Sequence, residues 1–214
     1  MAIVYKAELR PSKMELLARW LPHQPWFGGD SNALVRLGSF RFDDPDGEVG
    51  IETILVGAGS HAYQVPLSYR GAPFAGAEAF LIGTMEHSVL GSRWVYDATA
   101  DPVYVGELAA TLLTGKPQAV EMHDVPGRME TLTASARLSS TGTAAALPPL
   151  SFGRPTTADA LTEVPAGVLT LRIVRALDLS GVVHGEPALT ATWAGQDTPV
   201  QLAAPVPVVE LVET

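Results

Sequence analysis

The sequence predicts a mainly antiparallel β protein of the α+β class, in which a curved sheet packs on a helix and a smaller β-rich unit follows. Two observations carry this prediction. Apolar and polar residues alternate in short runs along most of the chain, as they do in strands that bury one face. Helical spacing with capping residues occurs near the start and near residue 105. A curved antiparallel sheet wrapped on a helix buries the apolar faces of both elements.

The first elements are a strand and a short helix. Residues 2–10 alternate as a strand does, and Pro11 ends that run. Ser12 and Glu15 then have the spacing of a capping box, which predicts the start of a helix. An apolar stripe follows at helical spacing, and Pro22 ends it.

The next segments are typical of antiparallel hairpins. Residues 33–42 and 48–57 flank the sequence DDPDG at 43–47, which is a strong turn signal, so they predict a hairpin. Pro66 indicates that the following strand is an edge strand or carries a bulge. Further strands of this half are expected at 61–69, 78–87 and 92–97.

A second helix and a change of composition follow. Asp101 predicts an N-cap with Pro102 at the first helical position, and Gly115 ends the helix. Residues 116–127 have the composition of a linker. We therefore divide the chain into two predicted domains, 1–118 and 119–214.

The second domain is expected to be β-rich. Residues 128–138 alternate as one strand, whereas 139–166 predict a long loop with at most one short helical turn. Pro205 and Pro207 make 205–212 typical of an edge strand or an extended tail. Further strands of this half are expected at 167–176, 187–194 and 198–203.

The composition excludes several classes of function. The chain has 214 residues, a formal charge of −9 and no cysteine. The missing cysteines exclude disulfides, thiolate metal sites and a cysteine nucleophile. The acidic balance argues against nucleic acid. Neither a membrane-length apolar run nor a signal-peptide core is found, so we expect a cytoplasmic protein without a membrane partner.

The sequence contains no complete catalytic motif. None of the five histidines has metal-ligand spacing with another, and no Gly-x-Ser-x-Gly elbow occurs. Residues 121–124 are the densest group of potential ligands, but a solvated loop explains them better. The acidic turn at 43–48 is likewise explained as a solvated hairpin tip, since its spacing is not that of an EF-hand. We predict no catalytic residue, metal or cofactor. A glycosidase site is not excluded, because its two carboxylates can be distant from each other in the chain.

The aromatic residues are the best candidates for ligand contact. Trp26 and Phe27 follow one another in a glycine-containing loop, and aromatic faces stack on sugars as well as fill cores. We favour packing for these rings. The binding candidates, in part suggested by the resemblance given next, are Trp26, Phe27, Gly28, Gly29, Tyr63, Trp94 and Asp97.

An ordered set of motifs resembles the N-terminal cap domain of maltokinases, over about residues 5–115. The set begins with ARWLPHQPWFGG at 18–29, continues with AYQVPL at 62–67 and LIG at 81–83, and closes with VYDA at 95–98 before the helix. The chain also resembles stand-alone cap-like proteins of actinobacteria, some of which are labelled α-glucan branching proteins.

The resemblance implies a cystatin-like fold, a curved antiparallel sheet around a helix. In maltokinases this cap precedes the kinase, which phosphorylates maltose with ATP, and it is not the catalytic lobe. Two positions depart from the pattern: Pro25 and Asp30 stand where the family has basic residues. Residues 139–143 and 169–175 resemble a nucleotide loop and a strand of the kinase intermediate subdomain, but Thr170 replaces the phosphate-binding lysine. The second half is therefore a remnant of that subdomain or an unrelated β unit.

These expectations favour a non-catalytic cap-like module that binds or regulates in trehalose, maltose or α-glucan metabolism. Its partner would be a protein or a sugar. The alternatives are an enzyme acting on α-glucans and a structural dimerisation module, and a homodimer is left open. Converging carboxylates in a pocket would favour the enzyme, whereas an exposed aromatic strip at Trp26 and Phe27 would favour binding.

Overall fold

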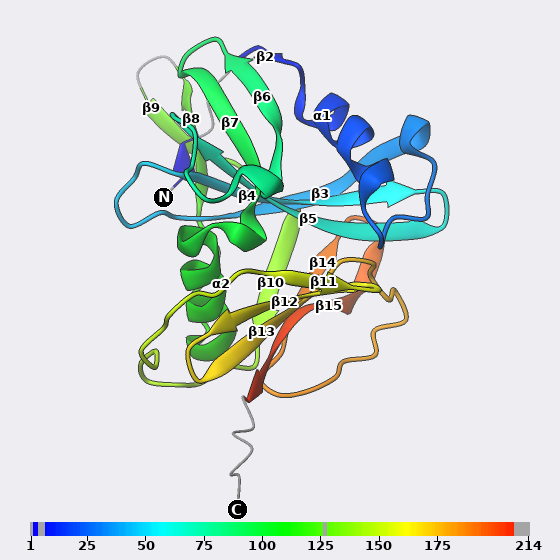
Figure 1. Ribbon diagram of the computed structural model, residues 1–214, viewed down its shortest axis with the longest axis vertical. Helices are drawn as coiled ribbons and strands as arrows, with labels where there is room; N and C mark the ends of the chain where they lie inside the picture. Colours follow the sequence, from blue (N-terminus) through cyan, green and yellow to red (C-terminus); the bar gives the residue numbers. More distant parts are fainter. Residues whose placement is uncertain (1, 4–6, 126–127, 208–214) are drawn as a thin grey trace, which may run out of the picture.

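Two six-stranded antiparallel sheets form most of the protein (Figure 1). The computed structural model describes residues 2–3, 7–125 and 128–207. The first sheet has the order β2-β6-β7-β5-β4-β3. Its strands are β2 (Leu9–Arg10), β3 (Leu34–Phe42), β4 (Gly50–Ala58), β5 (His61–Arg70), β6 (Leu81–His87) and β7 (Gly91–Asp97).

The second sheet has the order β10-β14-β15-β13-β12-β11. Its strands are β10 (Ala136–Ser140), β11 (Thr156–Ala158), β12 (Leu161–Ala166), β13 (Leu169–Val174), β14 (Leu189–Trp193) and β15 (Gln196–Pro207). A small third sheet, in which β1 and β8 are parallel, consists of β1 (Ala2–Ile3), β8 (Glu121–Val125) and β9 (Arg128–Thr131). The mainly antiparallel β class predicted from the sequence is confirmed.

Two α-helices occur in the described ranges, α1 (Lys13–Trp20) and α2 (Pro102–Thr114). Both have the predicted caps. The Ser12 side chain accepts a hydrogen bond from the Glu15 N–H, while the Glu15 side chain accepts one from the Ser12 N–H. Asp101 caps α2, which ends at Gly115 with φ +72°. Neither helix is long and apolar enough to cross a membrane. The short 3-10 helices are η1 (Leu21–His23), η2 (Ser31–Ala33), η3 (Glu78–Phe80) and η4 (Ala98–Ala100).

The predicted hairpin of β3 and β4 is confirmed, but the expectation for Pro66 is wrong. Strand β5 lies between β4 and β7, and it pairs with β4 without a register shift. Pairing of β5 with β7 starts at Leu67, one residue beyond Pro66. A proline is tolerated inside the sheet because no β7 residue pairs with it.

Three expectations for residues 116–166 are wrong in detail. The linker contains β8, and the single strand at 128–138 is two strands, because β9 pairs with β8 whereas β10 pairs with β14. The long loop at 139–166 contains β11 and β12 and no helical turn. Its small polar residues masked the alternation of β12, in which Thr162, Val164 and Ala166 are buried. At the chain's end, β15 runs to Pro207, and 208–214 lie outside the described residues.

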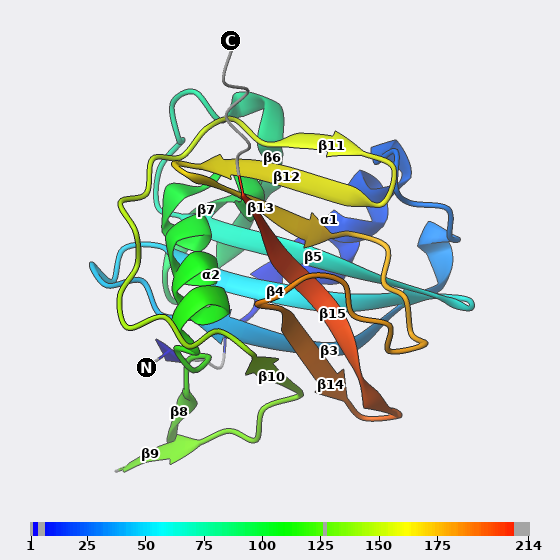
Figure 2. The same cartoon turned by 90° about the horizontal axis from the view of Figure 1, so that it is seen from below.

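The first sheet has a core on each face. On one face, residues of α1 and η1 pack with β4, β5, β6 and β7. On the other, α2 and residues of β3 and β4 share a core with the second sheet. Figure 2 shows α2 running beside both sheets. The first sheet is therefore an inner layer, and its two faces have different neighbours.

The two predicted domains share hydrogen bonds as well as a core. The Gln64 side chain donates to the carbonyls of Val174, at 2.9 Å, and Leu202, at 3.0 Å. The backbone of residues 62–64 also pairs with 175–177, along the edge of β5 that β7 leaves free. The division at residue 118 stays a prediction.

Candidate functional site

Four of the predicted binding residues lie together at the end of α1. Trp26 is 6% exposed, and its ring centroid lies 5.8 Å from that of Tyr63. The ring of Phe27 lies 4.9 Å from the same tyrosine. The Gly28 N–H donates to the Tyr63 hydroxyl at 3.1 Å. These contacts agree with the packing that we favoured for Trp26, while Phe27 is half-buried and Gly28 is exposed.

The two glycines of this loop have different surroundings. A Cβ atom on Gly29 would lie 2.5 Å from the Cβ of Ala58, which is closer than real side chains approach. A Cβ on Gly28 would have no atom within 4 Å. Position 29 therefore requires glycine, because the loop passes directly over Ala58 of β4.

Asp97 is connected to these residues through Arg175, which follows β13 of the second sheet. Its carboxylate binds the guanidinium of Arg175, which is 1% exposed at the side chain. The Arg175 guanidinium carbon lies 5.3 Å from the centre of the Trp26 ring. Trp94 stays apart, because alternation along β7 places it on the opposite face from Arg93 and Val95.

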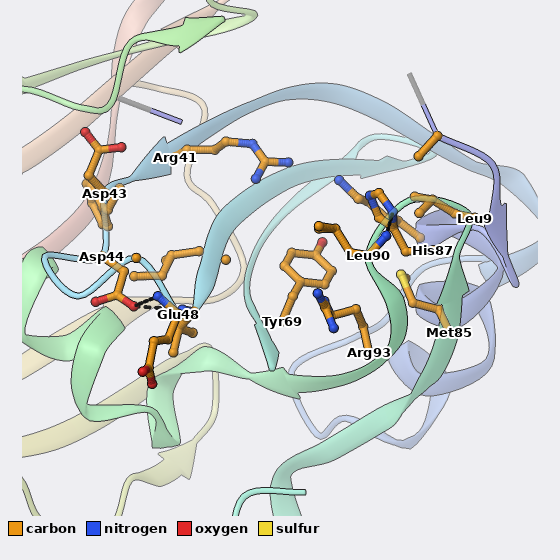
Figure 3. Close-up of a pocket in the computed structure, with 17 residues that line it drawn as sticks. Leu9, Arg41, Asp43, Asp44, Glu48, Tyr69, Met85, His87, Leu90 and Arg93 are labelled. Carbon is orange, nitrogen blue, oxygen red and sulfur yellow. Dashed lines mark hydrogen bonds between the residues drawn. The ribbon is translucent and has the colours of Figure 1, made fainter. Parts of the chain in front are cut away.

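A cavity of about 520 Å³ lies elsewhere on the first sheet, between the β3–β4 turn and the strands β2, β6 and β7 (Figure 3). Its size suits a small ligand. Strands β2 to β7, the first residue of α1 and the β3–β4 turn all contribute to its wall. The lining consists of Ala7, Leu9, Lys13, Arg41, Phe42, Asp43, Asp44, Gly47, Glu48, Val49, Gly50, Ile51, Tyr69, Met85, His87, Leu90 and Arg93.

Side chains hold both turns at the rim of this cavity. The Asp44 carboxylate accepts hydrogen bonds from the N–H groups of Asp46, Glu48 and Val49, at 2.7–3.0 Å. On the opposite rim, Nδ1 of His87 accepts from the N–H groups of residues 89 and 90, at 3.2 and 3.1 Å. The cavity is thus bordered by turns whose backbone is already organised.

A buried carboxylate, Glu52, lies beneath the cavity. Its side chain is 1% exposed and binds Lys13 and Arg41, which line the cavity, as well as Arg36. The Tyr69 hydroxyl donates to the same carboxylate at 3.1 Å. We call Glu52, Lys13, Arg36, Arg41 and Tyr69 the Glu52 cluster.

The cluster's charges shift the pKa values of its members. Burial raises the pKa of Glu52, but the charges of Arg41, Lys13 and Arg36 outweigh it and hold the pKa at about 2. Burial lowers the pKa of Lys13, against the attraction of Glu52. Burial and the neighbouring carboxylate together raise the pKa of the Tyr69 hydroxyl. Glu52 is therefore ionised and Tyr69 neutral at physiological pH.

The charges around the cavity are arranged in two groups. Figure 3 shows Asp43, Asp44 and Glu48 together at one end, while Arg93 and His87 lie at the other end. Arg41 reaches in from β3. Such a cavity offers cations and carboxylates to different parts of one ligand.

The sequence analysis missed every member of the Glu52 cluster. Its charged residues are single and separated in the chain, and the register of β3 with β4 and the position of α1 bring them together. One signal was present: Glu52 is the only charged residue in β4, a strand that is otherwise apolar or small. A lone charge on a buried strand requires partners.

Acidic side chains elsewhere in the described part of the chain lie beside cations or backbone N–H groups. No group of three or more His, Asp or Glu side chains converges on a metal position in the described part of the chain. His123 lies 3.7 Å from Glu130 across β8 and β9, and Glu121 lies 3.6 Å from Arg41. In the β3–β4 turn, Asp44 is occupied by backbone N–H groups.

Comparison with known families identifies one region. Residues 20–101 match the family model of the maltokinase N-terminal cap domain, which confirms the cap-like region that the sequence motifs indicated. The matched stretch begins at the last residue of α1, contains β3 to β7 and ends at the N-cap of α2. Glu52, Arg41 and Arg93 lie inside it, whereas Lys13 and the second sheet lie outside. No curated protein matches the chain.

Proposed function

We propose that the chain is a non-catalytic, cap-like module that binds a sugar or a partner protein in cytoplasmic trehalose, maltose or α-glucan metabolism. The observation that carries the proposal is the match of residues 20–101 to the maltokinase cap domain. By the resemblance, that domain accompanies a kinase and does not perform the phosphoryl transfer. In this proposal the first sheet with α1 is the cystatin-like unit of the family.

The state of the carboxylates supports a binding role. A glycosidase needs two carboxyl groups that face the same sugar, one of them with a raised pKa. Glu52 already accepts hydrogen bonds from four side chains, so it is not available as a nucleophile. Burial raises the pKa of Glu121, but this residue is not part of the cavity wall. The carboxylates that do line the wall, Asp43, Asp44 and Glu48, stand together on one turn and do not face one another across the cavity, and Asp44 already accepts three backbone hydrogen bonds (Figure 3).

The proposal is tested by measuring binding and turnover on the same protein. The purified chain is screened by thermal shift with ATP, maltose, trehalose and glycogen fragments. We expect a sugar to raise the melting temperature and ATP to leave it unchanged. In parallel, the chain is incubated with soluble α-glucan, and reducing ends and branch points are counted.

Two results would overturn the proposal. New reducing ends or branches at a rate above that of a heat-denatured control would make the chain an enzyme. A large thermal shift with ATP would indicate that nucleotide binding has been retained. The loop at 26–29 is a second candidate site, separate from the cavity. Because Trp26 is buried and Phe27 is half-buried, the variant Phe27→Ala reports whether a bound sugar contacts this loop.

A further inference from the structure

We propose that the cavity between the β3–β4 and β6–β7 turns binds a phosphorylated sugar. The phosphate would lie at the end that carries Arg93 and Lys13, and the sugar hydroxyls would lie at the carboxylates of the β3–β4 turn. This inference rests on the proposed function, because it specifies the ligand of the binding module.

The first argument is an excess of positive charge at one side of the cavity. Lys13, Arg36 and Arg41 share the carboxylate of Glu52, and Arg41 has Glu121 as a second acidic neighbour at 3.6 Å. Arg93 adds another cation, and it forms no ion pair within the described residues, since its Nη1 donates to a backbone carbonyl at 3.0 Å. Three lining cations, Lys13, Arg41 and Arg93, therefore stand on this side of the cavity against the carboxylates of Glu52 and Glu121, which leaves positive charge for an anion.

The three side chains His87, Lys13 and Arg93 line the same cavity, and the charges of both cations act on the histidine. Burial lowers the pKa of His87, and the charges of Arg93 and Lys13 lower it further. Both cations therefore act on the same side of the cavity, although they come from β7 and α1. A phosphate group, with several acceptor oxygens and up to two charges, is suited to cations that approach from two directions.

The opposite end of the cavity would recognise hydroxyl groups. Asp43 and Glu48 stand on the β3–β4 turn, and carboxylates accept hydrogen bonds from sugar hydroxyls. Asp44 holds the turn through three backbone N–H groups, so the neighbouring carboxylates are held in place. Apolar side chains also line the cavity, among them Leu9, Val49 and Met85, and they offer a surface for the C–H faces of a sugar ring.

The arrangement distinguishes a phosphorylated sugar from simpler ligands. Inorganic phosphate would use only the cationic end and would meet no hydroxyl contacts at the other. An unphosphorylated sugar would leave the excess cations unpaired. A long polyanion is disfavoured, because the acidic turn and the net charge of −9 repel it. A ligand that combines an anion with hydroxyl groups uses both ends.

The test is titration calorimetry with matched ligands. Glucose and trehalose are compared with glucose 6-phosphate and trehalose 6-phosphate, and inorganic phosphate is measured alone. We expect a phosphorylated sugar to bind about tenfold or more tightly than its unphosphorylated form, which is the effect of one charge-assisted contact. We also expect it to bind more tightly than inorganic phosphate.

Three variants locate the ligand. Arg93→Gln should weaken binding of the phosphorylated sugar about tenfold and leave the plain sugar unchanged. Glu48→Gln should weaken binding of the phosphorylated sugar and leave inorganic phosphate unchanged. The matched control is Arg137→Gln, which removes an exposed cation from β10 of the other sheet and should behave as wild type. Unfolding curves of each variant show that the fold is retained.

Several results would overturn the inference. These are equal affinity for the sugar with and without phosphate, inorganic phosphate that binds as tightly as the ester, no binding at millimolar concentration, or a loss caused by Phe27→Ala and not by Arg93→Gln. The proposed function fails differently. Turnover of an α-glucan would overturn the proposed function, whatever effect Arg93→Gln has on binding. If the chain binds an unphosphorylated sugar and Arg93→Gln does not change that affinity, the proposed function is supported and only the phosphorylated-sugar inference fails.

Discussion

Two buried carboxylates of the cap-like region, Asp97 and Glu52, are neutralised in different ways. Asp97 has one cationic partner, Arg175, and both side chains are nearly excluded from solvent. Glu52 has three cationic partners, and these are 15–45% exposed at the side chain. The first pair is balanced and enclosed, so it serves the structure. The second group carries surplus positive charge beside a cavity, so it can serve a ligand.

The partners of Arg175 show what the enclosed pair does. Its Nε donates to the hydroxyl of Thr162 at 2.8 Å, and its Nη2 donates to Thr99 at 3.1 Å as well as to Asp97. Thr162 belongs to the second sheet, whereas Asp97 and Thr99 belong to the first half of the chain. The pair therefore connects the two halves in the interior. A connection of this kind cannot lose its only cation without leaving a buried charge.

The largest expected effect is that of removing the enclosed cation. Arg175→Met leaves Asp97 buried without a counter-ion, and we expect the free energy of unfolding to fall by about 3–5 kcal/mol. Urea unfolding followed by tryptophan fluorescence measures the change. The matched control is Arg172→Met, which breaks a half-exposed pair with Glu163 and should cost about 0–1 kcal/mol. Equal losses in the two variants would mean that enclosure does not distinguish the pairs.

The second effect is a pH dependence due to Glu52. Its pKa is about 2 in the folded protein against an ordinary 4.5, so its ion pairs stabilise the fold above pH 4.5. That stability is lost as the pH falls from about 4.5 to 2, and it amounts to about 3 kcal/mol. In urea unfolding over this range, wild type should lose about 3 kcal/mol more than Glu52→Gln. Parallel pH profiles for the two proteins would contradict the ionised, buried state of Glu52.

A smaller effect is expected from the hydroxyl that supports the enclosed pair. Thr99 donates to Asp97 at 2.8 Å and accepts from Arg175 at 3.1 Å. Thr99→Val keeps the shape and removes both hydrogen bonds, so the free energy of unfolding should fall by about 1–3 kcal/mol. Thermal denaturation measures it, with Thr156→Val on the exposed strand β11 as control. A neutral Thr99→Val variant would show that the salt bridge alone is sufficient.

The smallest expected effect is that of removing one cation from Glu52, and it shows most clearly how Glu52 differs from Asp97. Lys13→Met removes one of three cations from Glu52, and Arg36, Arg41 and Tyr69 remain as partners. Because burial already disfavours the charged lysine, we expect a change within about 1 kcal/mol. Urea unfolding at neutral pH checks this. If Lys13→Met were as costly as Arg175→Met, the Glu52 cluster would hold no surplus charge.

Local interactions explain which elements could be predicted from the sequence. The capping box of Ser12 and Glu15, the N-cap at Asp101 and the left-handed Gly115 each act within a few residues, so their patterns are visible in the chain. The β3–β4 hairpin is also local. The strands β8, β11 and β12 were missed, because their identity depends on pairing and burial and their own composition is that of a loop.

The candidate binding sites show the same difference between local and long-range interactions. Motif similarity indicated a cap-like region over about residues 5–115, and the family model matches residues 20–101 of it. The packing interpretation was correct for Trp26, which is buried. The cavity could not be predicted, because Lys13, Glu52, Tyr69 and Arg93 come from α1, β4, β5 and β7. No spacing rule connects residues on four elements.

Short-range chemistry in the sequence was sufficient for the mainly β class, the helix ends, the hairpin and the cap-like resemblance. The tertiary structure decided which charges meet. An isolated Glu or Lys has the same local preferences whether it is solvated or buried. The register of β3 with β4, which puts Arg41 opposite Glu52, and the position of α1 together bring three cations onto Glu52. The same packing places Arg175 over Trp26 and beside Asp97, which no local pattern in the chain anticipates.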